Sequence, residues 1–515
     1  MDYEETQTNN SREKGYVMKP VLAAFMAVGL AAASSIGLAQ AQGTLNLGVP
    51  SNLNTLDPAK TKIGEEYIVN YLVFSGLTEI ERSGEVKPDL AESWEASDDL
   101  KSWTFHLRKD VTFHDGSAFT AEDVKATIER VMDKATASTA RVNFEIVESI
   151  EIADDHTIRF QLSQPYAGFA EILGDRQVRI VSSDHLETIA SDPIGTGPFK
   201  LESFQPGDRL ELVKNDNYYN PDVPKLDAIT IRISPERSAQ FAGLETGELD
   251  LIWDVPPETV GEYGDNPDVM MDSVATSTWD GIIMNASQEP FDDEKVRLAV
   301  SLALDKQALV DIALFGNGTP SHTMIPPSHP FYNDELPLTE VDTERAKELL
   351  AEAGFEDGFE ITLYVPVGRP TRERLGLGVA DMLKDIGVRA SIQRVPWDKF
   401  VKDIEGKAAF FTDGFYSRPT IDTSIFPWYH STGTWNTTLW NYSNPEMDKV
   451  LEAARAAKSD EERASLYKEF QKIAVEQPAG IIPYVMNHTN AFRPSVKNFH
   501  SHPMMFLDLR NVTVE

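Results

Sequence analysis

The chain has 515 residues, and 82 Asp and Glu against 47 Lys and Arg give it a formal net charge of −35 at pH 7. This balance excludes nucleic acid as a partner, because binding to phosphates needs a basic face, and it argues against docking on anionic lipid. The absence of cysteine excludes disulfides, thiolate metal sites, cysteine nucleophiles and a lipid-modified cysteine.

The N-terminal region has the pattern of a secretory signal peptide. Lys19 precedes the apolar run 21–38, and Ala39–Ala41 form the small-x-small pattern of a cleavage site. We therefore expect residues 1–41 to be a signal peptide that sends the chain to the periplasm, with Met18 as an alternative start. An uncleaved membrane anchor is the other interpretation of the apolar run.

The first part of the mature chain is predicted to alternate strands with short helices. Residues 44–50 alternate like a half-buried strand, and residues 66–74 fit a helix. Thr120 and Asp123 form a capping pattern that starts a further helix. The inner face of that helix is predicted to hold Val124, Ile128 and Val131. Further strands are predicted at 102–107, 149–153 and 157–162.

The composition changes at residue 193 and again near residue 280. Residues 193–200 form a turn rich in glycine and proline, and segment 237–252 fits a helix, a glycine turn and a strand. The shift near 280 marks the expected crossover between two lobes. Two strands follow the first turn, at 201–204 and 209–213.

The second half is predicted to alternate helices and strands in the manner of an α/β lobe. A long amphipathic helix is expected at 296–314, and Ser459 with Glu462 forms a capping box for a late helix. Between them the pattern predicts helices at 342–354 and 371–386 and strands at 359–365 and 388–395.

Residues 87–130 carry a series of motifs in a fixed order. They are Pro88–Trp94, the strand Trp103–Leu107, the turn Phe113–Gly116 and the helix start Phe119–Val124. This series resembles the signature region of the bacterial extracytoplasmic solute-binding proteins of the peptide/nickel-type ABC importers, family 5. Asn215–Tyr219, segment 237–252 and Pro290–Arg297 also resemble elements of the family, so the resemblance covers nearly all of 44–510.

The resemblance implies an α/β fold of the periplasmic-binding-protein-like type II, with two lobes, an additional domain and a cleft that closes about a hinge. Lobe I would comprise residues 42–72, 193–280 and 483–515. The additional domain would comprise residues 73–192, and lobe II residues 281–482. Chain crossings between the lobes would serve as the hinge.

No enzyme or metal motif is found in the sequence. It contains no Gly-x-Ser-x-Gly, His-Glu-x-x-His or Walker A pattern, so we expect no catalytic residue and no cofactor. The resemblance implies structural roles for His106 and His114. His500 and His502 would lie on one side of an extended segment; no metal site is expected there, but nickel or haem stays open because the family includes such relatives.

The segment most informative about the ligand is 410–442. In this family the matching segment lines the ligand cleft, and peptide-binding members use an aspartate there to bind the ligand's α-ammonium group. In this sequence Arg418 falls at that position and Asp422 follows it. An arginine in a closed cleft favours a carboxylate, a phosphate or a planar polar ligand. The alternatives are that Asp422 binds the ammonium group, or that Arg418 is a surface residue.

Aromatic residues crowd the same neighbourhood and are candidates to line the cleft. The predicted ligand-binding set is Arg418, Tyr416, Phe415, Asp422, Trp435, Trp397 and Trp279.

The resemblance therefore predicts the periplasmic substrate-binding subunit of an ABC transporter. It would act as a monomer, capture a peptide, opine, amino-acid derivative or oligosaccharide, and deliver it to a permease and an ATPase. A ligand-binding sensor or chaperone-like module is the main alternative. An exported hydrolase is a second alternative, for which no nucleophile or metal set is visible in the sequence.

Overall fold

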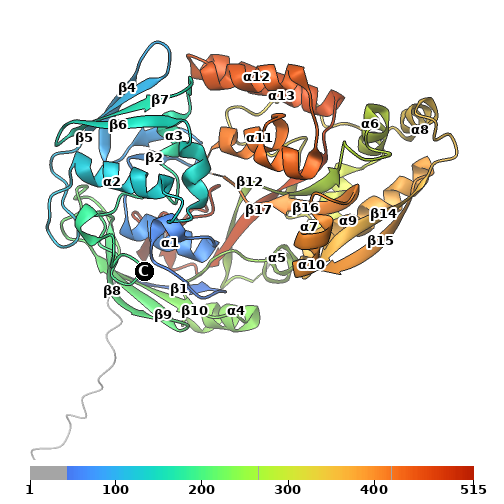
Figure 1. Cartoon of the computed structure of the whole chain (residues 1–515). Coiled ribbons are helices and arrows are strands. Elements are labelled where there is room, and N and C mark those ends of the chain that lie inside the picture. The colour runs from blue at the N-terminus through green and yellow to red at the C-terminus, as the bar shows by residue number, and fades with distance from the viewer. Residues whose placement is uncertain (1–42, 265, 419) are drawn as a thin grey trace, which may run out of the picture. The chain divides into compact units, whose positions relative to one another are not determined.

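The computed structural model describes residues 43–264, 266–418 and 420–515, so the predicted signal peptide 1–41 lies outside the described residues. A sheet of 11 strands forms the centre of the described part, in the order β15-β14-β16-β12-β17-β11-β1-β10-β9-β8, with β13 paired to β17 (Figure 1). Among the described helices, none combines the length and apolar character needed to cross a bilayer.

Lobe I surrounds one end of this sheet. β1 (Thr44–Val49) pairs in parallel with β10 (Ala228–Ile233) and β11 (Leu251–Ile252), which confirms the first predicted strand. The remaining elements are α1 (Gly64–Val73), β8 (Phe199–Gln205), β9 (Arg209–Lys214), α4 (Arg237–Thr246), α5 (Pro257–Tyr263), β18 (Val496–Lys497) and β19 (Thr513–Val514). One apolar cluster joins the N-terminal strand, α1 and the C-terminal segment, so residues distant in sequence share this core.

The additional domain is built on an antiparallel sheet of four strands in the order β4-β5-β7-β6. Its elements are β2 (Thr78–Ile80), β3 (Val86–Pro88), β4 (Ala91–Ala96), β5 (Ser102–Leu107), α2 (Ala121–Met132), β6 (Val147–Asp154), β7 (Thr157–Leu162) and α3 (Phe169–Ile172). The capping prediction is confirmed: Thr120 N donates to Asp123 Oδ2 at 2.9 Å.

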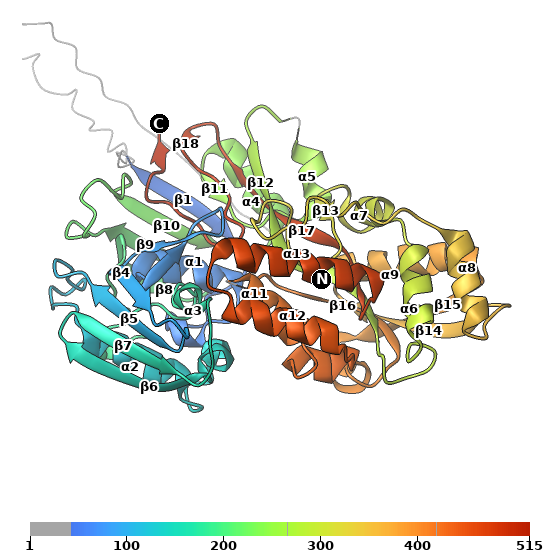
Figure 2. The same ribbon diagram turned by 90° about the horizontal axis from the view of Figure 1, so that it is seen from above.

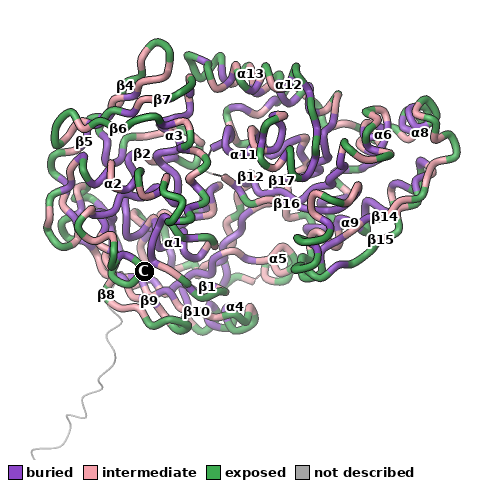
Figure 3. The backbone as a smooth tube through the Cα atoms, viewed as in Figure 1, coloured by how far each residue is buried: buried purple, intermediate pink, exposed green. Residues whose placement is uncertain are grey.

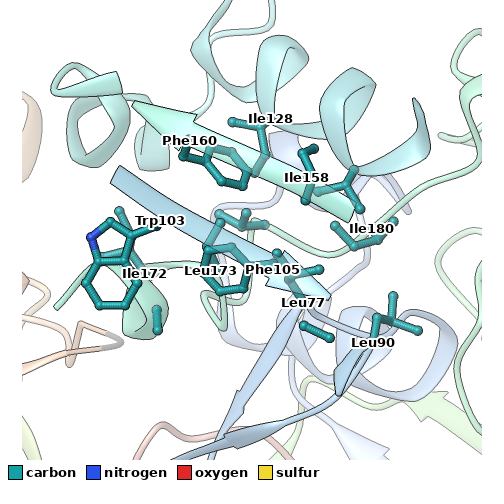
Figure 4. Packing of buried hydrophobic residues seen from close by; sticks show 14 of the residues in the cluster. Leu77, Leu90, Trp103, Phe105, Ile128, Ile158, Phe160, Ile172, Leu173 and Ile180 are labelled. Atoms are coloured by element: carbon teal, nitrogen blue, oxygen red, sulfur yellow. The ribbon is translucent and has the colours of Figure 1, made fainter. Parts of the chain in front are cut away.

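The core of this domain holds the buried apolar residues of the motifs that carry the family resemblance. Phe105 of β5 meets Phe160 of β7 edge to face, in a cluster that also holds Trp103 of β5 and Ile128 of α2 (Figure 4). His114 is held in the turn after β5, where its Nε2 lies 3.1 Å from the carbonyl oxygen of Gly197. These residues therefore serve the scaffold, as the resemblance implies.

Lobe II is an α/β layer with helices on both faces. β14 (Glu360–Val367) and β15 (Arg389–Pro396) are parallel and joined through α9 (Pro370–Met382), which confirms the predicted alternation. The other elements are α6 (Glu294–Leu302), α7 (Lys306–Leu314), β13 (Gly318–Pro320), α8 (Thr343–Glu352), α10 (Trp397–Lys399), β16 (Phe410–Phe415), α11 (Ile421–Tyr429), α12 (Pro445–Ala456) and α13 (Asp460–Glu476).

The two faces of lobe II have separate cores, because neighbouring residues of a strand point to opposite sides. Phe410 of β16 packs with α6 to α9, whereas Phe411 packs with α11 to α13. In Figure 2, α12 and α13 lie side by side on the second face. The predicted helix start at Ser459 is confirmed, since Ser459 Oγ accepts from Glu462 N at 3.2 Å.

The prediction of one long helix at 296–314 is wrong. The structure has two helices, α6 and α7, separated by a short break in which Asp305 becomes an N-cap. Its side chain accepts a hydrogen bond from Ala308 N at 2.9 Å. An aspartate that satisfies backbone donors in this way favours a new helix start over continuation of the old helix.

The strands β12 (Met270–Met284) and β17 (Ile481–Phe492) pair along their length and belong to both lobes (Figures 1 and 2). The first residues of β12 pair with the end of β17 whose other edge pairs with β11. The second half of β12, which is buried, pairs with β16 (Figure 3). Between Ala275 and Trp279, β12 contains more residues than the opposing stretch Val485–Asn487. This β-bulge lies where the sheet passes from one lobe to the other. The residues at which each predicted part begins and ends stay a prediction.

Lys306, at the start of α7, is buried and ties the loop after β13 to the helix. Its Nζ donates to the carbonyl oxygen of Ser321 at 2.9 Å and to Nδ1 of His322 at 2.7 Å. Burial lowers the pKa of Lys306 to about 7. The folded chain therefore releases this proton at a pH where the unfolded chain still keeps it.

Because the unfolded state binds more protons above pH 7, stability should rise with pH in this window. We expect the free energy of unfolding to increase by about 1 kcal/mol per pH unit between pH 7 and 9. Lys306→Met should flatten this slope. Urea unfolding of both proteins at pH 7, 8 and 9 measures it, and equal slopes would contradict the assignment.

Candidate functional site

Residues 416–418 leave the end of β16 and cross the region of the β-bulge. Ser417 N donates to Thr278 Oγ1 at 3.0 Å, and the hydroxyls of Ser417 and Ser277 lie 3.2 Å apart. The buried Ser417 thereby fixes the path of the chain at the junction of the lobes. Its neighbours Tyr416 and Arg418 are the more accessible residues of this crossing.

Arg418 lines a cavity of about 350 Å³ between the additional domain and lobe II. The guanidinium lies over the ring of Phe415 at 4.5 Å. The cavity is walled by the turn 81–86 of the additional domain, the lobe II loop 328–331 and the C-terminal residues 502–504. Such a mixture of apolar walls and a few charged groups is typical of a small-molecule site.

A second arginine, Arg176, affects the pKa of Arg418. Burial and the positive charge of Arg176 lower the pKa of Arg418 to about 10, while Asp175 opposes them. Arg176 is itself buried and lies over the ring of Tyr67, on α1, at 4.0 Å. Arg418 remains protonated at neutral pH, and a ligand carboxylate would be a suitable partner for its charge.

Tyr416, next to Ser417 at the end of β16, is 65% exposed. Partial loss of hydration raises its pKa; the charge of Asp254 raises it further, and that of Arg369 lowers it. Asp254 belongs to lobe I, whereas Tyr416 and Arg369 belong to lobe II. Charges of opposite sign, one on each lobe, therefore act on the pKa of this hydroxyl.

Trp397 and Arg369 form a separate exposed pair. The Arg369 guanidinium lies over the Trp397 ring at 4.5 Å, and Trp397 is 37% exposed. Arg372, one helical turn further along α9, is instead half-buried, with Nε 2.9 Å from Asp280 Oδ1 and Nη1 2.7 Å from Asp413 Oδ1. This ion-pair group ties α9 to β12 and β16.

The predicted aromatic residues are only partly accessible. Phe415 and Trp435 pack together with 4.9 Å between ring centroids, and both contact the buried Trp428. Trp279 is 2% exposed and meets Trp428 edge to face at 4.8 Å. In the described structure Trp279 is therefore part of the core of lobe II, and a contact between Trp279 and ligand stays a prediction.

Asp422 is buried and bound by protein groups. Its carboxylate accepts from Arg455 Nε at 2.9 Å and Nη2 at 2.8 Å, and from the hydroxyl of Tyr166 at 3.0 Å. Burial acts to raise the pKa of Asp422, but the charge and hydrogen bonds of Arg455 outweigh it and lower the pKa. A ligand ammonium group would have to displace Arg455, so the predicted ligand contact of Asp422 stays untested.

The same contacts join the additional domain to lobe II. Tyr166 belongs to the additional domain, and Ala167 N donates to the carbonyl oxygen of Arg455 at 2.7 Å. Glu171 also forms a buried ion pair with Arg463 at the wall of the cavity. The cavity is thus closed on this side by charged groups that already have partners.

The structure brings Arg418, Tyr416, Phe415 and Trp435 into one neighbourhood, with Trp397 further along lobe II. Sequence reasoning missed Asp254, Arg369 and Arg176. Each stands outside the segment 410–442, and no local pattern distinguishes them from other charged residues.

The histidine pair near the C-terminus differs from the expectation. His500 is exposed, whereas His502 is buried and its ring lies 4.0 Å from that of Phe506. The expectation that both imidazoles lie on one side is therefore wrong. Across the described residues, no three His, Asp or Glu side chains gather as a metal ion would require.

Comparison with known proteins finds solute-binding proteins both by sequence and by structure. Residues 85–437 match the model of the bacterial extracellular solute-binding proteins, family 5 middle region. The glutathione-binding protein GsiB of Salmonella typhimurium is 32% identical over 461 residues, which cover 87% of this chain and 90% of that protein.

Among solved structures, HbpA2 of Haemophilus parasuis aligns with a TM-score of 0.83 and 26% identity, covering 92% of this chain and 100% of that one. The periplasmic binding protein DppA of Helicobacter pylori, solved with the peptide STSA, aligns with a TM-score of 0.74 and 26% identity, covering 92% and 98%.

Proposed function

The chain belongs to the bacterial extracellular solute-binding proteins of family 5, and from this membership we propose that it captures a small peptide-like solute through a free carboxylate. Proteins of this family are substrate-binding subunits of ABC importers and have the two-lobed type II fold. We place this protein in the periplasm as a monomer that hands its ligand to a membrane permease. Catalysis has no part in this role.

The proposal of a carboxylate-bearing ligand rests on the surroundings of Arg418. Its guanidinium lies over the ring of Phe415, and among the described residues it forms no ion pair with an acidic side chain. Arg418 also lines the cavity, and the charge of the buried Arg176 lowers its pKa. A ligand carboxylate can accept two parallel hydrogen bonds from a guanidinium, which a lysine cannot reproduce. The name of the relative GsiB makes glutathione, a peptide with two carboxylates, the first compound to test.

The proposal is tested by titrating the purified protein. Glutathione, the dipeptide Met-Leu, agropinic acid and nickel with L-histidine represent ligands named for relatives. We expect a carboxylate-bearing peptide to raise the melting temperature, because a ligand that binds only the folded state stabilises it by mass action. If no such compound shifts the melting temperature and a chromogenic ester or peptide is hydrolysed, the proposal fails.

Arg418→Ala is expected to weaken binding of the carboxylate ligand by roughly 10- to 100-fold, since a hydrogen bond to a charged group contributes about 1.5 to 3 kcal/mol. The affinity of Arg418→Lys for this ligand should lie between those of Arg418→Ala and the wild type. Isothermal titration calorimetry measures both. Arg389→Ala, which removes an exposed arginine of β15, serves as the control. An unchanged affinity in Arg418→Ala would contradict the assignment.

A further inference from the structure

Gly84 brings the additional domain into close contact with lobe II. It lies in the turn between β2 and β3 with a φ of 86°, in the left-handed region that glycine adopts without steric cost. A Cβ atom at this position would lie 2.8 Å from Nε2 and 3.1 Å from Cδ2 of His329, in the lobe II loop 328–331. Non-bonded carbon atoms pack best at about 3.5 to 4.0 Å. The turn therefore meets this ring as it does only because residue 84 has no side chain.

The hairpin that carries this turn is anchored at its base. Thr78 Oγ1 of β2 donates to the carbonyl oxygen of Ala170 at 2.6 Å, and the next residue, Glu79, forms an ion pair with Arg510 near the C-terminus. The two strands also pair with each other directly before and after the turn. A side chain added at residue 84 would therefore push against a hairpin that is held by its surroundings.

His329 is fixed on the lobe II side of the contact. Its Nδ1 accepts a hydrogen bond from Phe331 N at 3.1 Å, and the two rings meet edge to face at 4.9 Å. Phe331 in turn stacks on Tyr467 of α13 at 5.1 Å, and its carbonyl oxygen accepts from Gln471 Nε2 at 2.8 Å. Loss of hydration and the charge of Arg463 lower the pKa of His329 to about 3, so the ring is neutral at pH 7.

The contact between Gly84 and His329 belongs to the wall of the cavity that Arg418 also lines. Gly84 reaches this wall from the additional domain, and His329 reaches it from lobe II. Glu171 and Arg463, which form an ion pair across the same junction, line the cavity as well. If the additional domain and lobe II separated, this part of the wall would be lost.

We propose that residues 81–85 act as a latch: the turn rests against His329 when the protein closes, and the absence of a side chain at Gly84 lets the closed state form. The inference rests on the proposed function, because it concerns closure around a captured solute. If the closed state is populated only to a fraction f, the apparent dissociation constant is the intrinsic value divided by f. The fit at Gly84 therefore affects the affinity for every ligand, whatever chemical groups that ligand carries.

The test measures the distance between the additional domain and lobe II in solution. Because the chain has no cysteine, Glu129→Cys on α2 and Lys384→Cys just after α9 introduce two unique, exposed sites for spin labels. Double electron–electron resonance is recorded without ligand and with glutathione or Met-Leu as the probe. Wild type should show a population at a short distance that a bound probe increases. Gly84→Ala should lose most of this population, because the added methyl group collides with His329.

Gly116→Ala is the matched control. Gly116 also lies in the additional domain and has a φ of 90°, but among the described residues no atom lies within 4 Å of a Cβ at this position. Both variants carry the backbone cost of a positive φ, so the collision with His329 is what distinguishes them. The double variant Gly84→Ala with His329→Ala removes the ring and should restore the wild-type distances. Circular dichroism verifies that each variant is folded.

Calorimetry supplies the second measurement. A probe that binds wild type should bind Gly84→Ala at least about tenfold more weakly, whereas Gly116→Ala keeps the wild-type affinity and the double variant regains it. The inference is overturned if Gly84→Ala keeps either the wild-type distances or the wild-type affinity, or if Gly116→Ala loses them to the same extent. If neither probe binds wild type, the proposed function loses its support, and the distances without ligand still decide whether the latch exists.

Discussion

Replacing Asp422 with alanine is expected to lower the free energy of unfolding by roughly 3 to 5 kcal/mol, the range for removing one partner of a buried ion pair. The variant leaves the Arg455 guanidinium inside the protein without its carboxylate. It also removes the acceptor of the Tyr166 hydroxyl, at 3.0 Å, and of the Tyr467 hydroxyl, at 3.4 Å. Because these groups join the additional domain to lobe II, the loss affects both parts.

Urea unfolding at pH 7, followed by circular dichroism, measures this effect. Asp381→Ala is the matched control, since Asp381 pairs with Lys384 at the surface of α9, where ion pairs contribute little. The double variant Asp422→Ala with Arg455→Met should regain part of the lost stability, because the stranded charge is gone. If Asp422→Ala lowers the free energy of unfolding by less than about 1 kcal/mol, the ion pair does not stabilise the contact between the additional domain and lobe II.

Arg372→Met is expected to cost about 3 to 5 kcal/mol for a related reason. The arginine neutralises two buried carboxylates, Asp280 and Asp413, and its Nη2 donates to the Gly414 carbonyl oxygen at 2.7 Å. Without it the carboxylates repel each other inside the protein. Burial already raises the pKa of Asp413, against the opposing charge of Arg372, and the variant removes that opposition.

The loss in Arg372→Met should therefore depend on pH. As the pH falls, Asp413 of the variant takes up a proton at a higher pH than in the wild type, and the repulsion disappears. The stability difference between variant and wild type should be smaller at pH 5 than at pH 7. Arg389→Met, at an exposed ion pair on the neighbouring β15, should show little change at either pH. A difference independent of pH would contradict this explanation.

Local patterns predicted much of the fold because they depend on near neighbours. The strands predicted at 102–107 and 157–162 match β5 and β7 residue for residue, since alternation marks a sheet with one buried face. Val124, Ile128 and Val131 of α2 are all fully buried, as the helical period requires. The helix prediction at 296–314 failed at Asp305, where a single capping side chain outweighed the continuous apolar period.

The site was predictable only in part, because its chemistry comes from remote segments. Arg418 could be singled out by its place in a family motif. Asp254 could not, because its φ of 57° and its contact with His488 exist only once β17 lies beside β11. Asp422 is close in sequence to Arg418, yet its partners Tyr166 and Arg455 come from other parts of the chain. The hydrogen bonds of Asp422 could therefore not be predicted from the residues around it.

The pairing of β17 with β11 also determines when this protein can fold. The parallel partners β1 and β10 meet only after residues 44–233 have been made, and β11 gains its second neighbour only with residues 491–492. Contacts between such distant residues form slowly, because a long loop must close before they stabilise anything. The sheet of lobe I therefore stays incomplete until almost the whole polypeptide exists. This lobe can therefore complete its fold only after β17 has been synthesised.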